Sequence, residues 1–146
     1  MISYKLKKNQ SQLVIIDVQE RLLPVIANNK SIVKHSKLLL RCAQVLSIPV
    51  KYTEQYPKGL GPTVSDISDL LPPETPRFEK VHFSCYDEPG FIDFLGNERR
   101  QIVLAGIVKK TFIFYTNLDF VPERKHGGVL PAAGGRRGEK HKTPAA

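Results

Sequence analysis

Acidic, amide and lysine side chains stand at the ends of several short apolar or β-branched runs of the sequence. Asp17 closes the run LVIID, and Glu54 and Gln55 lie near the end of PVKYTEQY. Lys80 lies inside a third extended segment, FEKVHFSC. If the strands are parallel, such side chains converge beyond the carboxyl ends of the sheet, where open α/β sheets bind their ligands. These residues are therefore the first candidates for proton transfer or for binding of a small ligand.

A fourth candidate region is the stretch AGIVKKTFIFYTNLDF (105–120), which begins as a strand, runs into a glycine and ends as an apolar, helix-like segment. A strand-to-helix turn of this kind is where α/β enzymes mount a reactive side chain, but this turn offers no obvious nucleophile. Lys109 and Lys110 stand at the predicted helix start, where positive charge opposes the helix dipole unless an anion binds there. Two explanations remain for the position of these lysines. The turn forms an anion-binding pocket, or its sequence has drifted because the site is no longer under selection.

The elements that must position these side chains alternate between strands and helices. LVIID is typical of a central parallel strand that is buried on both faces. The predicted first helix covers 31–48, with Ile32, Leu39, Ala43 and Leu46 at helical spacing on its apolar face. The later segments are a strand at 49–56, a loop at 58–63, a helix at 64–71, an edge strand at 78–85, a helix at 89–100, a strand at 101–107 and a helix at 112–120. This order predicts a three-layer α/β/α fold with a mostly parallel sheet.

Composition and charge limit the classes of protein to consider. A chain of 146 residues with 41% hydrophobic and 25% charged residues fits one globular domain without metals or disulfides. Its two cysteines, Cys42 and Cys85, form no metal or disulfide pattern, and both are expected to pack in the interior. The polar start MISYKLKKNQ and the absence of a long apolar run predict a cytoplasmic protein with no membrane contact.

The net charge of +8 divides equally between two regions of different character. Residues 121–146 carry six Lys or Arg against two Glu, together with five glycines and three prolines. Because this segment has almost no large apolar side chain to bury, it is predicted to be a disordered, solvated tail. It also lacks an aromatic side chain for stacking on bases, so no nucleic-acid partner is expected. The folded domain is therefore expected to occupy residues 1–120.

Four stretches resemble the isochorismatase-like cysteine hydrolases, in that family's order and at its usual separations. They are LVIIDVQERLLPVI (13–26), TEQYPKGLGPTV (53–64), FEKVHFSC (78–85) and QIVLAGI (101–107). The resemblance extends over roughly residues 5 to 120 and implies a parallel α/β fold. It is greatest to the metal-independent subgroup without an assigned substrate, because the metal-binding Asp and His cluster of the nicotinamidase branch has no counterpart in 52–90. No cofactor or metal is therefore expected.

The resemblance implies a catalytic triad of aspartate, lysine and cysteine. The aspartate and the lysine correspond to Asp17 and Lys80, with Asp17 as the base and Lys80 as the group that keeps it charged. In the family, an oxyanion hole of backbone N–H groups includes one from a cis peptide bond. Here that bond would be Val108–Lys109, with the amides of Lys109 and Phe112 as donors. Substrate-binding roles are expected for Gln19, Glu54 and Gln55.

The position of the family's nucleophilic cysteine is occupied by Phe112. Thr116, Leu118 and Asp119 still follow the family pattern, so a substitution explains the missing cysteine better than a misalignment. Beyond Phe120 the agreement ends where the family continues into two more strand and helix units, and a frame-shifted or decayed gene end is one hypothesis. Loss of those units would expose the edge of the last strand, so that either another chain covers this edge or the protein is prone to aggregate.

Two functions follow from these observations. The first is a hydrolase-like protein, originally for a small amide, ester or vinyl-ether substrate, whose activity is lost or strongly impaired. The alternative is a non-catalytic protein that keeps the fold in order to bind a small anion or to act as an oligomer partner. The expected partners are a small-molecule substrate or anion, and a second copy of the chain or an intact paralogue.

Overall fold

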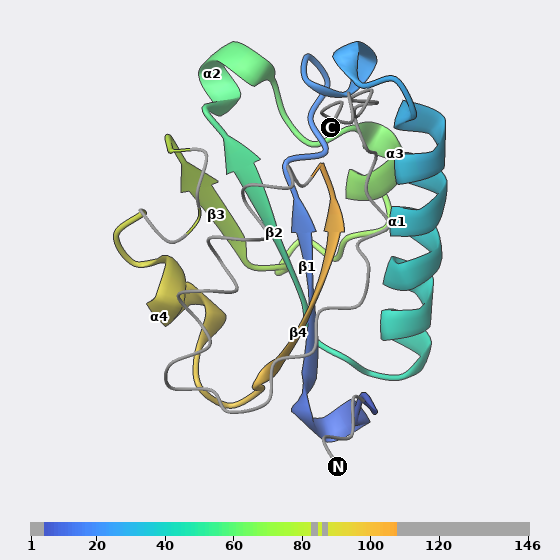
Figure 1. Ribbon diagram of the computed structural model, residues 1–146, viewed down its shortest axis with the longest axis vertical. Coiled ribbons are helices and arrows are strands. Elements are labelled where there is room, and N and C mark those ends of the chain that lie inside the picture. The colour runs from blue at the N-terminus through green and yellow to red at the C-terminus, as the bar shows by residue number, and fades with distance from the viewer. Residues whose placement is uncertain (1–4, 83–84, 86–87, 108–146) are drawn as a thin grey trace, which may run out of the picture.

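The computed structural model describes residues 5–82, 85 and 88–107, which form one sheet and the helices that cover it (Figure 1). In chain order the elements are η1 (Lys8–Gln10), β1 (Ser11–Ile16), η2 (Leu23–Val25), α1 (Asn29–Val45), β2 (Val50–Gln55), α2 (Pro57–Leu60), α3 (Ser65–Ser68), β3 (Arg77–Lys80), α4 (Phe91–Leu95) and β4 (Gln101–Gly106). The predicted helix at 112–120 and the predicted tail at 121–146 lie outside the described residues.

The sheet has the order β3-β2-β1-β4, and every neighbouring pair of strands is parallel. Its central strand is β1, whose six residues are all buried. From β1 the chain moves through β2 to β3 on one side, and it then returns to the other side of β1 to form β4. The topological switch point therefore lies between β1 and β4, and a ligand crevice is expected beyond the carboxyl ends of these two strands.

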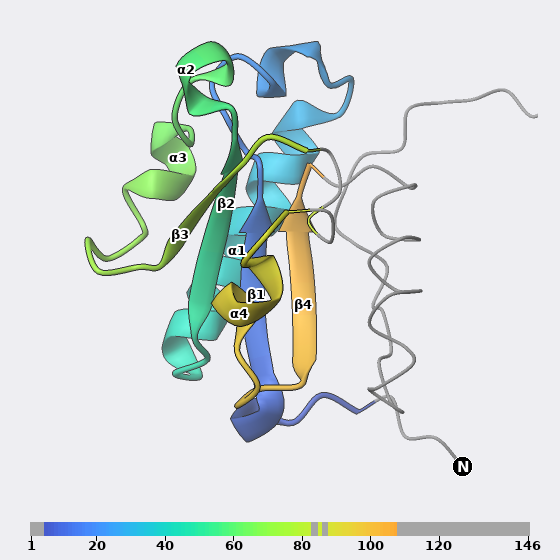
Figure 2. The ribbon, with the colours of Figure 1, turned by 90° about the vertical axis from the view of Figure 1, so that its left-hand side faces the viewer.

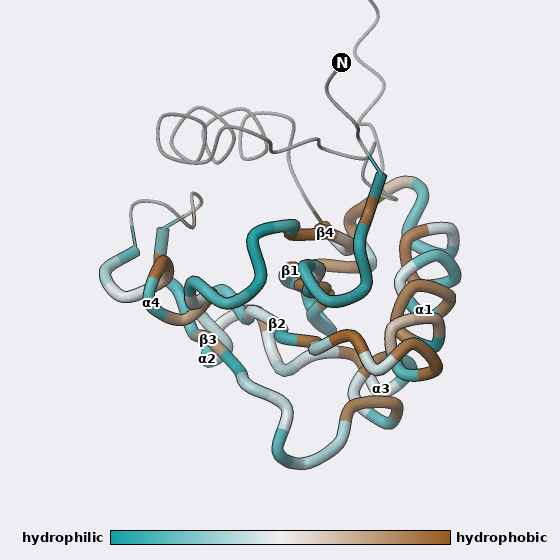
Figure 3. The backbone as a smooth tube through the Cα atoms, turned by 90° about the horizontal axis from the view of Figure 1, so that it is seen from below, coloured by the Kyte–Doolittle hydropathy of each residue, from teal (hydrophilic) through white to brown (hydrophobic). Residues whose placement is uncertain are grey.

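Alternate residues of β1 pack against different helical layers. Leu13 and Ile15 face the core that they share with α1 and α3, whereas Val14 and Ile16 face the core that they share with α4. Viewed from the side, α1 and α4 lie on opposite faces of the sheet (Figure 2). The hydrophobic colour gathers where β1, β4 and the inner side of α1 meet (Figure 3). The predicted three-layer α/β fold is confirmed.

The amphipathic pattern of α1 is correct in part. The buried residues of the helix are Ile32, Ser36, Leu40 and Ala43, so two of the four predicted apolar positions are buried. The prediction for Leu46 is wrong, because α1 ends at Val45 and the side chain of Leu46 is 46% exposed. Cys42 is also exposed rather than packed, since it lies about 100° around the helix from Ala43.

Several shorter elements differ from the sequence prediction in extent. The first three residues of the predicted loop at 58–63 belong to α2 instead. This helix forms a single turn because the proline at its first position has a φ that suits a helix. The predicted helix at 89–100 is limited to α4 because Gly96 ends it with a φ of 71°. Lys51 of β2 donates hydrogen bonds to the last carbonyl groups of α4 and so holds this short helix against the sheet.

Candidate active site

Asp17 follows the central strand directly and has an unusual backbone conformation. Its φ of 51° lies in the left-handed region, which a non-glycine residue adopts rarely and which Asp tolerates better than most. The N–H group of Asp17 donates to the carbonyl group of Thr53 at 3.2 Å, which fixes this turn to the end of β2. The strained turn places a carboxylate at the carboxyl end of β1, beside the switch point of the sheet.

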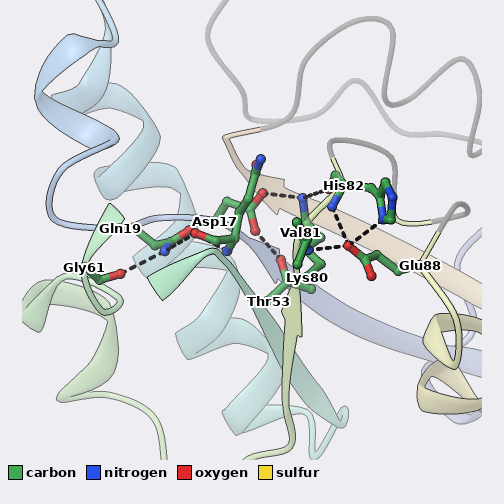
Figure 4. Close-up of polar contacts among 9 residues, drawn as sticks. Asp17, Gln19, Thr53, Gly61, Lys80, Val81, His82 and Glu88 are labelled. Carbon is green, nitrogen blue, oxygen red and sulfur yellow. Dashed lines mark hydrogen bonds and ion pairs between the residues drawn. The ribbon is translucent and has the colours of Figure 1, made fainter. Parts of the chain in front are cut away.

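The Asp17 carboxylate is buried and forms an ion pair with Lys80. Asp17 Oδ2 lies 2.8 Å from Lys80 Nζ, and the two side chains are 5% and 1% exposed. Asp17 Oδ1 accepts a hydrogen bond of 2.7 Å from the Thr53 hydroxyl group. Both carboxylate oxygens therefore have a partner, and the lysine charge is compensated where water cannot reach it (Figure 4). A buried ion pair is stable only if the two charges are close and hydrogen-bonded, because burying either ion alone would cost several kcal/mol.

The segment after β3 holds Lys80 from the other side. Lys80 Nζ donates to the His82 carbonyl group at 3.2 Å. The N–H groups of Val81 and His82 both donate to Glu88 Oε1, which also lies 3.1 Å from His82 Nδ1 (Figure 4). Partial burial opposes ionisation of Glu88, but these hydrogen bonds outweigh it and lower the pKa of the carboxyl group. A charged Glu88 thus fixes the turn whose carbonyl group contacts the lysine.

The thiol group of Cys85 is an interior group and not an exposed nucleophile. Cys85 is fully buried in the core that it shares with Val14, Ile16 and Phe91, as the sequence predicted. Burial raises the pKa of this thiol, and the negative charges of Asp17 and Glu88 add to the effect against the opposing charge of Lys80. The thiol stays protonated at neutral pH, and a protonated thiol is a poor nucleophile.

The predicted substrate-binding side chains make contacts within the protein. Gln19 donates to the carbonyl groups of Gln55 and Gly61, and its own side-chain oxygen accepts from the N–H group of Gln55. Its contacts thereby join the end of β2 to the turn at Gly61 (Figure 4).

Glu54 is likewise engaged on both carboxylate oxygens. Its Oε2 atom accepts hydrogen bonds from the N–H and hydroxyl groups of Thr63, at 2.5 and 3.0 Å. Its Oε1 atom pairs with Arg77 at 2.7 Å. Glu54 thus joins β2, β3 and the segment around Thr63.

The structure therefore brings Asp17 and Lys80 together, while Lys109 and Phe112 lie outside the described residues, as does the predicted Val108–Lys109 bond. Within 5–82, 85 and 88–107, no group of three or more His, Cys, Asp or Glu side chains could hold a metal ion. In that same part of the chain, no helix is both long and apolar enough to cross a membrane.

Sequence reasoning missed three residues of the site, namely Thr53, His82 and Glu88. Thr53 pairs in register with Ile16, the residue before Asp17. Alignment of the two strand sequences, β1 with β2, could therefore have predicted that Thr53 lies beside Asp17. No signal of this kind exists for Glu88, because its contacts depend on the path of an irregular segment.

The all-parallel sheet with helices on both faces defines a three-layer α/β protein, and the buried Asp17–Lys80 pair lies at the carboxyl ends of β1 and β3. The isochorismatase domain matches residues 11–121, and the chain therefore belongs to the isochorismatase family. One relative is isochorismatase domain-containing protein 2 of Danio rerio, which is 34% identical over 120 residues, or 80% of this chain and 58% of the relative. The human protein of the same name is 32% identical over 114 residues, or 76% of this chain and 53% of that protein.

Solved structures agree with this assignment. The MAR1 ribonuclease of Caenorhabditis elegans superimposes with a TM-score of 0.68 and 34% identity, covering 80% of this chain and 60% of that chain. YcaC of Escherichia coli, described as an octameric hydrolase of unknown specificity, gives a TM-score of 0.71 at 21% identity, covering 84% and 62% of the two chains. At that identity the likeness to YcaC shows the fold alone. The chain spans a little more than half the length of the curated relatives that it matches.

Proposed function

We propose that this chain is a hydrolase-like isochorismatase-family protein that retains the charged part of an active site and lacks its nucleophile. The supporting observation is the buried ion pair between Asp17 and Lys80, with 2.8 Å between its charged atoms. Phe112 stands at the cysteine position of the family pattern. Hydrolysis of a small amide, ester or vinyl-ether substrate is therefore lost or strongly impaired.

The charges of Asp17 and Lys80 are those that a cysteine hydrolase needs to activate its thiol. In a cysteine hydrolase, a carboxylate can accept the thiol proton while a lysine adds positive potential that favours the thiolate. Asp17 and Lys80 have the charges for these two roles. A phenyl ring carries neither a proton to release nor a lone pair for attack, so Phe112 offers the pair nothing to activate. Cys85 is not a substitute, because its buried thiol has a raised pKa.

The other site residues have supporting roles in this proposal. Gln19 holds the backbone of Gln55 and Gly61 in place, and Glu54 holds the backbone of Thr63. The amides of Lys109 and Phe112 are the proposed donors to a substrate oxyanion, as the family resemblance implies. A small molecule or anion is the ligand of this site.

The alternative function is a non-catalytic one, as a small-anion-binding protein or as a partner within an oligomer. It is favoured by the same combination of a preserved charged pair and an absent nucleophile. The partner in such an oligomer is either a second copy of this chain or an intact paralogue. We also place the protein in the cytoplasm, where free cysteines such as Cys42 and Cys85 stay reduced.

Hydrolysis assays with a panel of small esters and amides test the proposal. The unmodified protein and the Phe112→Ala variant should both remain at the background rate, whereas Phe112→Cys should exceed it by at least about tenfold, because the pair regains a thiol. A change of stability alone would not produce turnover in one variant and not in the other. Turnover that survives Phe112→Ala and disappears in Cys85→Ala would overturn the assignment.

A further inference from the structure

Helix α1 carries a row of positive charges along its outer side. Its only charged side chains other than a histidine are Lys30, Lys34, Lys37 and Arg41, and it contains no acidic residue. The spacing of four, three and four residues places all four on one side of the helix. With a rise of about 1.5 Å per residue, this row extends over about 16 Å, or three turns. We call these four residues the basic stripe.

The stability of the domain does not account for the basic stripe. Like charges four residues apart repel each other by a few tenths of a kcal/mol. Lys30 lies in the first turn of α1, where the helix dipole disfavours a positive charge. No stripe residue takes part in an ion pair in the part of the chain that the structure describes. A helix with acidic residues at some of these positions would be more stable, so the charges are better explained by an external partner.

An open groove of about 740 Å³ lies beside the basic stripe and gives it a second kind of contact surface. Its apolar lining comes from η2 and α1, namely Leu23, Pro24, Val33 and Leu38. Leu38 is 58% exposed, which is high for a leucine on a helix. The groove is also lined by all four stripe residues and by Asp66 of α3, which is the one acidic residue among the described residues of the lining. The surface therefore combines an excess of positive charge with apolar side chains.

We propose that this groove binds an acidic amphipathic helix from a protein partner. Such a helix can lay apolar side chains into the groove while Glu or Asp residues at the same three- and four-residue spacing meet the basic stripe. A second copy of this chain is a poor occupant, because the chain carries a net charge of +8. A nucleic acid fits less well, because none of the described residues that line the groove is an aromatic residue on which bases could stack. This surface is separate from the Asp17–Lys80 site.

The test measures binding of a labelled synthetic peptide by fluorescence anisotropy. The peptide has about 15 residues, long enough for marginal helix formation, with Glu at the stripe spacing and Leu on the adjacent side. A scrambled peptide of the same composition controls for net charge. The stripe variant carries Lys30→Glu, Lys34→Glu and Arg41→Glu. The matched control reverses three exposed charges elsewhere, as Lys5→Glu, Lys8→Glu and Arg100→Glu.

The unmodified protein should bind the patterned peptide one to one and more tightly than the scrambled peptide. The stripe variant should lose at least about tenfold in affinity and the matched control less than about twofold. Leu38→Ser should weaken binding several-fold without changing its salt dependence, since it removes apolar contact only. The melting temperature of the stripe variant should equal or exceed that of the unmodified protein, because its charge reversals relieve repulsion and favour the dipole.

Three outcomes would overturn the proposal. One is an equal loss of affinity in the stripe variant and in the matched control, and another is equal binding of the two peptides. The third is tighter, stripe-dependent binding of a short single-stranded RNA or of phosphatidylserine vesicles than of the patterned peptide. The fold of each variant is checked by circular dichroism. If the stripe variant does not fold, a variant with Lys30→Gln, Lys34→Gln and Arg41→Gln replaces it in the same comparison of affinities.

Discussion

Replacement of Lys80 by methionine is expected to lower the free energy of unfolding by about 3–5 kcal/mol, the range measured when one partner of a buried ion pair is removed. Methionine fills much of the same volume, so the effect comes from the charge. Asp17 Oδ2 would lose its partner at 2.8 Å, while Oδ1 would keep only the Thr53 hydroxyl group. A carboxylate in that position must either remain buried without a cation or take up a proton.

A double-mutant cycle with urea denaturation measures this effect. Asp17→Asn combined with Lys80→Met removes both charges, and the double variant should be clearly more stable than the sum of the single changes predicts. The control is Lys58→Met on α2, where the lysine is exposed and a change within about 0.5 kcal/mol is expected. Additive single effects, or a Lys80→Met effect no larger than that of Lys58→Met, would contradict a tightly coupled pair.

Replacement of Gly106 by alanine is expected to lower the free energy of unfolding by more than about 3 kcal/mol, because backbone strain and a steric clash coincide there. Gly106 ends β4 with a φ of 108°. An added Cβ would lie 2.4 Å from the carbonyl oxygen of Ile16 and 2.9 Å from its nitrogen. These are backbone atoms of the central strand, so neither can move without disturbing the strand end that presents Asp17. The side chain of Asp17 should therefore be displaced as well.

The Gly96→Ala variant measures the cost of the backbone strain without the steric clash. Gly96 also has a positive φ, 71°, but an added Cβ there would meet no atom within 4 Å. This variant should lose only about 1–2 kcal/mol, the cost of the left-handed conformation. Thermal denaturation of the two variants side by side gives the comparison. If Gly106→Ala is as stable as Gly96→Ala, the close approach of β4 to β1 does not determine the geometry of the switch point.

The sequence predicts the sheet well where burial is continuous. β1 is buried at all six positions, and its run LVII has the continuous apolar pattern of a parallel strand covered on both faces. The run IVLA likewise predicted β4, although only Ala105 and Gly106 of that strand are buried. Asp17 and Lys80 could be predicted as a pair only through the family resemblance. Their separation of 63 positions carries no local periodicity, and the contact forms because β2 lies between β1 and β3.

Other features depend on tertiary contacts that no local pattern contains. Leu46 fits the helical spacing of α1, yet its exposure is decided by the place where the helix ends. The contacts of Glu88 with Val81 and His82 follow from an irregular path between β3 and α4. Glu54 has the position of a ligand-binding residue at a strand end, and only the structure reveals its contacts with Thr63 and Arg77. Local propensity places the elements, and long-range packing selects the partners.

The reactivity of the thiol introduced by Phe112→Cys tests most directly whether the charged part of the site is retained. Alkylation by iodoacetamide at about pH 7 is followed by mass spectrometry, with the exposed Cys42 as the internal reference in the same molecule. The introduced thiol should react at least about tenfold faster than Cys42, because the Asp17–Lys80 pair favours its thiolate. An introduced thiol that reacts no faster than Cys42 would contradict the claim that this chain retains the charged part of a cysteine hydrolase site.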